Sequence, residues 1–147
     1  MERNLRQNGF ERVVVHRAAV NDVAGSARLY LSEIEGGHLL FDHNVQGGLA
    51  EWVEVPTVTL EQIMEDERLE SIDFLKLDCE GAEGAILETT PRTCLRRVRQ
   101  IAMEFHDNVS RLDHRAMEAL LQDAGFRTQL RWNGRSPFGY LYAWQPR

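Results

Sequence analysis

The feature that most constrains the fold is a short apolar run that ends directly in an acidic, glycine-containing turn. Residues 72–77 read Ile-Asp-Phe-Leu-Lys-Leu and pass straight into Asp78-Cys79-Glu80-Gly81-Ala82-Glu83. This order is typical of a buried strand that feeds a helix. It recurs at residues 101–106, which precede a loop and a helix with Asp113 at its N-cap. Two strand-loop-helix units in series predict parallel strands, and therefore an α/β fold.

Local patterns predict the other elements of the chain. A helix ends at Asn8-Gly9, and the β-branched run at residues 13–20 predicts a buried strand. Further strands are expected at residues 28–31 and 52–55, and Thr59-Leu60-Glu61-Gln62 matches a capping box that begins a short helix. Residues 126–132 and 139–144 predict a final antiparallel pair of strands.

A glycine-bracketed segment between Gly36 and Gly48 shows no clear period. Its histidines, His38 and His43, lie close to Asp42, but without a regular helix to fix them on one face they are only a weak metal signal. We interpret the segment as a solvated insertion, with a substrate-covering loop as the functional alternative.

Composition restricts the classes of partner. The 147 residues carry a formal net charge of −6 and no basic face, which gives nucleic acid or anionic lipid little to bind. No apolar run approaches the ~20 residues of a membrane-spanning helix, and the start resembles no secretory signal. We therefore expect one folded domain over residues 1–147, a cytoplasmic location, and free thiols at the two cysteines, Cys79 and Cys94.

Both predicted strand ends are acidic. Ligands in open α/β sheets bind beyond the carboxyl ends of the parallel strands, where loops and helix N-termini face one crevice. The residues at these ends that carry chemistry are Asp78, Glu80, Glu83, Glu104 and His106. A structural interpretation stands beside this one. Asp78 would cap the following helix, while Glu80 and Glu83 would lie in its first turn, where the helix dipole favours carboxylates.

Two neighbouring residues have simpler interpretations. Lys76, the only lysine, is expected to form a salt bridge or reach solvent along its aliphatic stem. Cys79 lies between acids, which disfavour its thiolate, so it should be a poor nucleophile.

The segment Lys76-Leu77-Asp78-Cys79-Glu80-Gly81-Ala82-Glu83 resembles the K-x-D-x-E-G-x-E signature of FkbM-type methyltransferases. Four further segments, in order, are similar to other parts of that family. They are residues 4–9, the A-V-x-D-x-x-G turn at residues 19–25, the T-x-T-L segment at residues 57–60 (with Glu61 where Asp is usual), and the E-x-H strand end at residues 104–106. The resemblance implies a Rossmann-like class I methyltransferase sheet, with S-adenosylmethionine as the cofactor and a hydroxyl on a sugar or natural product as the acceptor.

The resemblance also implies roles for individual residues. His106 is the expected base, with Glu104 or Asp78 orienting it or holding acceptor hydroxyls. Asp78, Glu80 and Glu104 are the alternative ligands for a divalent cation. The cofactor is expected near Ala19, Val20, Asp22 and Asp78.

One family feature is missing from the sequence. No glycine-rich turn after a strand precedes Asn4, so the sheet is expected to be N-terminally truncated. Two alternatives to an active enzyme therefore stay open. One is a non-catalytic remnant, or a partial domain that forms a homo-oligomer or needs a partner chain to complete the sheet. The other is a metal-dependent hydrolase that uses the acid cluster.

Overall fold

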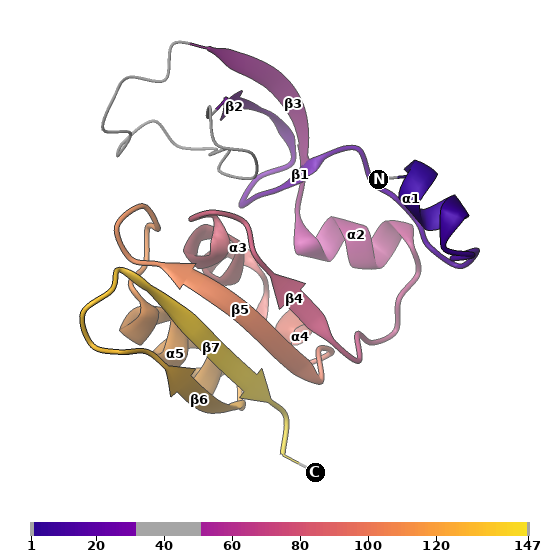
Figure 1. The fold of residues 1–147 in the computed structure, drawn as a ribbon. Helices are drawn as coiled ribbons and strands as arrows, with labels where there is room; N and C mark the ends of the chain where they lie inside the picture. Colours follow the sequence, from indigo (N-terminus) through magenta and orange to yellow (C-terminus); the bar gives the residue numbers. More distant parts are fainter. Residues whose placement is uncertain (1, 32–50, 147) are drawn as a thin grey trace.

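The computed structural model describes residues 2–31 and 51–146 (Figure 1). The segment between Gly36 and Gly48, with its predicted loop and with His38, Asp42 and His43, lies outside the described residues. The helices are α1 (Glu2–Gln7), α2 (Leu60–Asp66), α3 (Glu83–Thr89), α4 (Arg92–Leu95) and α5 (His114–Asp123). The strands are β1 (Ala19–Val20), β2 (Gly25–Tyr30), β3 (Trp52–Val58), β4 (Leu75–Leu77), β5 (Gln100–His106), β6 (Arg127–Arg131) and β7 (Phe138–Trp144).

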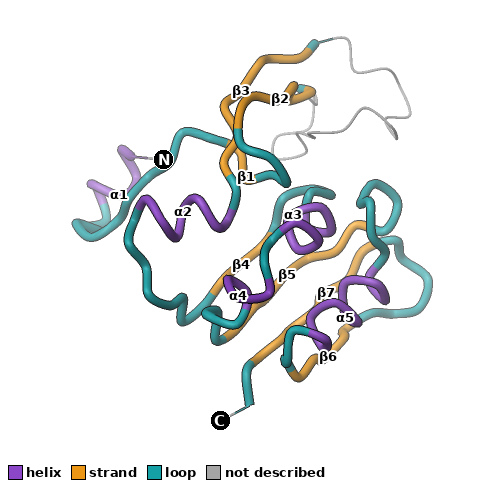
Figure 2. Tube along the Cα trace, turned by 180° about the vertical axis from the view of Figure 1, so that it is seen from behind, coloured by secondary structure: helices purple, strands orange, loops and turns teal. Residues whose placement is uncertain are grey.

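A four-stranded sheet in the order β4-β5-β7-β6 forms the larger layer. Strands β4 and β5 are parallel, with Leu77 opposite Met103, as the two strand-loop-helix units predict. Strand β7 pairs antiparallel with both β5 and β6, which confirms the predicted final antiparallel pair. Seen from the two opposite sides in Figures 1 and 2, helices α3, α4 and α5 all lie on the same face of this sheet.

The alternation of buried apolar and more exposed side chains along β5 explains why the helices cover that face. Ile101, Met103 and Phe105 point into the core, while the residues between them are more exposed. They pack with apolar side chains from strands β4 and β7 and from the helices, among them Leu77, Leu87, Leu95, Met117, Leu121 and Leu141. Burial of these side chains is the main force that holds the helices on the sheet.

The opposite face of the sheet is open in the described part of the chain. Strand β7 presents Phe138, Tyr140, Tyr142 and Trp144 there, each between 36% and 49% exposed, alternating with buried residues.

The predicted strand at residues 72–77 is shorter than expected. Only Leu75–Leu77 is strand, Ile72 makes one isolated bridge with Val98, and Phe74 is 58% exposed.

The second sheet has three strands in the order β1-β3-β2. Strand β1 is parallel to β3, and β2 is antiparallel to it, with Tyr30 opposite Trp52. The prediction of a buried strand from residue 13 onward was wrong, because only Ala19–Val20 pairs, and Val13 and Val14 are exposed. Their β-branched side chains favour extended backbone, but a strand is stable only where a neighbouring strand supplies hydrogen bonds.

Half of the predicted capping box forms at the start of α2. Thr59 is the N-cap, and its hydroxyl accepts a hydrogen bond from the backbone N–H of Gln62 at 3.1 Å. The reciprocal bond is missing, because Gln62 Oε1 is buried without a hydrogen-bond partner in the described residues.

We therefore expect Thr59→Ala to lower the free energy of unfolding by about 1 kcal/mol, since one helix-start amide loses its acceptor. Urea unfolding would measure the change. Thr59→Ser retains the hydroxyl and should stay close to wild type, and an equal loss in both variants would contradict the capping role.

Candidate functional site

The parallel pairing of β4 and β5 brings their carboxyl ends to one edge of the larger sheet. Asp78 follows β4 directly, and His106 is the last residue of β5. The turn between β4 and α3 adds Glu80, and α3 begins at Glu83. The acidic strand ends predicted from the sequence therefore meet at one edge.

Glu83 is fully buried in this turn, with 0% of its surface exposed. Its Oε1 accepts the backbone N–H of Cys79 at 2.7 Å, and its Oε2 accepts that of Gly81 at 2.9 Å. The prediction that Glu83 simply occupies the first helical turn, where the dipole favours carboxylates, is therefore incomplete. The carboxylate binds amides that precede the helix, and the turn folds around it.

His106 lies between two of the acids. Its Nδ1 is 3.5 Å from Oε1 of Glu83, and its Nε2 is 3.5 Å from Oε2 of Glu80. Both distances are long for a hydrogen bond, so the contacts are mainly electrostatic. The Glu83 carboxylate raises the pKa of His106 above the ordinary 6.5, burial opposes this, and the charges of Glu80 and Glu104 add to the rise.

This shift predicts a pH dependence of stability. A histidine whose pKa is higher in the folded state stabilises the fold fully below its unfolded pKa, and the contribution disappears as pH rises through the folded pKa. We expect the difference in unfolding free energy between wild type and His106→Gln to be largest below the ordinary histidine pKa of 6.5 and to shrink as the pH rises through the raised pKa of His106. Urea unfolding across this pH range would measure it, and a difference independent of pH would contradict the ion contact.

Glu104 lies in an adjacent hollow on the open face of the sheet. The hollow has a volume of about 260 Å³ and is lined by Lys76, Asp78, Ala102, Met103, Glu104, Tyr140 and Tyr142. Asp78 forms an ion pair with Lys76 at 2.5 Å, the salt bridge expected for this lysine. The carboxylates in contact with His106 are thus Glu83 and Glu80, whereas the sequence favoured Asp78 or Glu104 for that role.

Cys79 is unsuited to nucleophilic chemistry, as the sequence predicts. Burial, and then the Glu83 carboxylate, raise the pKa of its thiol to about 11. Both cysteines are free thiols.

Three of the predicted cofactor residues, Ala19, Val20 and Asp22, lie at the end of β1, whereas the fourth, Asp78, follows β4. Ala19 and Val20 pair with β3, and the turn after them carries Asn21 and Asp22. Asn21 Oδ1 is buried without a hydrogen-bond partner in the described residues, so this turn has an acceptor left for a ligand. Asp22 is engaged by Arg111, whose guanidinium also reaches Glu88 on α3.

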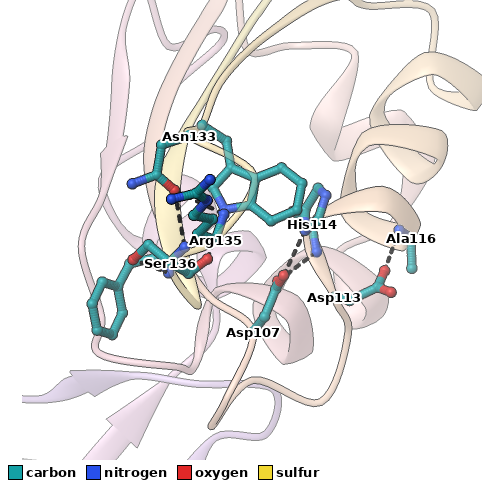
Figure 3. A network of polar contacts seen from close by, with 9 residues as sticks. Asp107, Asp113, His114, Ala116, Asn133, Arg135 and Ser136 are labelled. Carbon is teal, nitrogen blue, oxygen red and sulfur yellow. Dashed lines mark hydrogen bonds and ion pairs between the residues drawn. The ribbon is translucent and has the colours of Figure 1, made fainter.

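A second polar network stabilises the loop after β5, and sequence reasoning missed it (Figure 3). Asp107 accepts the backbone N–H of His114 at 2.7 Å and contacts its Nδ1 at 2.5 Å. The His114 ring stacks on Phe105 and lies against Trp132. The contact between Asp107 and His114 closes the loop that joins them. Val109, which belongs to this loop, packs directly over Gly81. A separation of seven residues carries no signal of such a contact in the sequence.

Within residues 2–31 and 51–146, no group of three or more His, Cys, Asp or Glu side chains is arranged to hold a metal ion, so this geometry gives no support to a cation at Asp78, Glu80 and Glu104. In the same ranges, no helix combines the length and apolar character needed to cross a membrane.

Comparison with known proteins agrees with the resemblance carried by the turn after β4. The Methyltransferase FkbM domain matches residues 3–128, which is most of the chain. The chain belongs to the FkbM methyltransferase family. No curated protein and no solved structure matches it. The mixed α/β arrangement of parallel and antiparallel strands is consistent with a fold of the methyltransferase type.

Proposed function

We propose that this FkbM domain takes part in S-adenosylmethionine-dependent methylation of a hydroxyl group on a sugar or natural-product acceptor. The observation that carries the proposal is His106, held between Glu83 and Glu80 at the shared carboxyl edge of β4 and β5. We further propose that the larger sheet is part of a Rossmann-like class I methyltransferase sheet.

His106 is the general base of this proposal. A hydroxyl is a weak nucleophile, so removing its proton as the new bond forms accelerates its attack. The neighbouring carboxylates stabilise the imidazolium that results, and the raised pKa of His106 makes it a stronger base. Glu80, which is 36% exposed at its side chain, is placed to accept a hydrogen bond from a second acceptor hydroxyl.

The cofactor residues fit S-adenosylmethionine in part. When bound, the cofactor supplies a methyl group carried on a positively charged sulfur. The buried, unpaired Oδ1 of Asn21 suits an amino-group donor, and the backbone of Ala19 and Val20 borders the same turn. Asp22 would have to exchange its contact with Arg111 for a ligand.

The test of this proposal is the position of the transferred methyl group. The chain is incubated with isotope-labelled S-adenosylmethionine and a panel of neutral sugars and hydroxylated natural products, and the products are analysed by mass spectrometry. We expect label on a hydroxyl oxygen. Label found only on nitrogen or carbon would contradict O-methylation.

The second candidate is a partial domain that another polypeptide completes. Within the described residues, β1 pairs only with β3 and β4 only with β5, so each has one free edge, and the open face of the larger sheet carries the aromatic side chains of β7. Free edges and exposed aromatic surface promote pairing with another chain. If no other partner is present, sedimentation velocity should detect self-association that weakens in Tyr142→Lys. A monomer at all concentrations would contradict this candidate.

A further inference from the structure

The buried carboxylate of Glu83 is not explained by burial of apolar surface. An unpaired buried carboxylate is strongly unfavourable, so its presence requires compensating donors. Those donors are the backbone amides of Cys79 and Gly81, one for each oxygen, at 2.7 and 2.9 Å. Amides that converge on one anion in this way form a nest, a backbone concavity that stabilises negative charge.

The backbone between the two donors is in an unfavourable conformation. Glu80 has φ of 50° and Gly81 has φ of 106°, both in the left-handed region. A non-glycine residue there is strained and persists only where its surroundings impose that conformation. The Glu83 carboxylate supplies that constraint, because it binds the backbone amides of the two residues that flank Glu80, Cys79 and Gly81. The direction of the Glu80 side chain towards His106 therefore depends on Glu83.

The same carboxylate faces His106 from the side of Nδ1. That nitrogen is buried, is 3.5 Å from Glu83 Oε1, and has no hydrogen-bond partner within the described residues. Nε2 faces the more exposed Glu80 instead. Each ring nitrogen thus faces a carboxylate at 3.5 Å, but Glu83 is fully buried whereas the side chain of Glu80 is 36% exposed and screened by solvent. The Glu83 contact is therefore the stronger one, and it favours a proton on Nδ1, which leaves Nε2 with a free lone pair.

We propose that Glu83 is a positioning residue: it holds the left-handed turn at Glu80 and Gly81, and it keeps the proton of neutral His106 on Nδ1. Nε2 is then the nitrogen that accepts a proton. The use of that nitrogen in catalysis rests on the proposed methyltransferase function, but the position of the proton does not.

The direct test is the tautomer of His106 in the wild-type chain, read from nitrogen-15 chemical shifts and two-bond ring correlations by NMR at a pH above the His106 pKa. We expect the Nδ1–H form. The Nε2–H form would overturn the proposal. Because the measurement needs no cofactor and no turnover, an Nδ1–H result with no cofactor binding would keep this inference and reject the proposed function.

Variants separate Glu83 from the other acid in contact with the ring. Glu83→Gln should lower the pKa of His106 more than Glu80→Gln does, since Glu80 is partly exposed and its charge is screened by solvent. Glu83→Gln should also increase the Nε2–H fraction, whereas Glu80→Gln, which removes the carboxylate that faces Nε2, should not. Glu104, the remaining acid whose charge acts on the ring, stays unchanged in both variants. An equal or larger fall in the His106 pKa in Glu80→Gln would overturn the assignment to Glu83. If Glu83→Gln does not fold, the wild-type tautomer decides.

Discussion

Replacing His106 with alanine is expected to lower the rate of methyl transfer by about 10²- to 10⁴-fold, the usual contribution of a general base. Affinity for S-adenosylmethionine should stay close to wild type, because Ala19, Val20 and Asp22 lie at the end of β1, and the fourth predicted cofactor residue, Asp78, pairs with Lys76 and not with the imidazole. The rate is to be measured in whichever form of the enzyme turns over, this chain alone or the chain with a completing segment. Binding is measured separately by calorimetry.

The matched control is His16→Ala. His16 forms its own contact with a carboxylate, Glu67 at 3.0 Å, outside the candidate site. This variant removes a histidine and an acid contact but should leave turnover unchanged. Retained turnover in His106→Ala would remove His106 from the mechanism. Loss of cofactor binding together with turnover would point to a structural role.

Gly81→Ala is expected to destabilise the fold by about 2–5 kcal/mol, the sum of left-handed backbone strain and overpacking. An added Cβ would lie 2.6 Å from Cγ2 of Val109, and φ at this position is 106°. Val109 belongs to the loop closed by Asp107 and His114, so it has little freedom to move away. A domain with a typical stability of about 5–15 kcal/mol would lose a large part of it.

Gly134→Ala separates strain from packing. Gly134 also has positive φ, 76°, but nothing lies within 4 Å of an added Cβ. The control should therefore show only the backbone cost, about 1–2 kcal/mol. Urea unfolding of both variants measures the difference. Equal losses would mean that the contact with Val109 does not hold the turn in place.

The parts of the fold that the sequence predicts are those with a local cause. The parallel pair β4 and β5, the final antiparallel pair and the N-caps at Thr59 and Asp113 follow from apolar periodicity and from residues that bind nearby amides. Val13–Val15 was predicted as strand from side-chain preference alone. It is not a strand, because pairing depends on a neighbour that no local pattern specifies.

In the candidate site, too, the sequence predicts the features with a local cause but not the contacts that depend on tertiary packing. The spacing of Asp78, Glu80 and His106 predicts that they share a sheet edge, since parallel strands align their carboxyl ends. The contacts between them depend on how the turn after β4 folds. The set of contacts around Glu83 is complete only when β5 brings His106 alongside it. The ring of His114 lies against Trp132, the residue that follows β6. These contacts arise from tertiary packing, which a single sequence does not encode in a readable spacing.

The measurement that most directly tests the central claim is calorimetric titration of S-adenosylmethionine into the purified chain. A domain that takes part in methyl transfer from this cofactor should give saturable binding heat, equal in wild type and His106→Ala and weaker in Asn21→Ala, which removes the buried Oδ1 after β1. The absence of saturable heat in the wild-type chain would contradict cofactor binding by this chain and favour the partial domain.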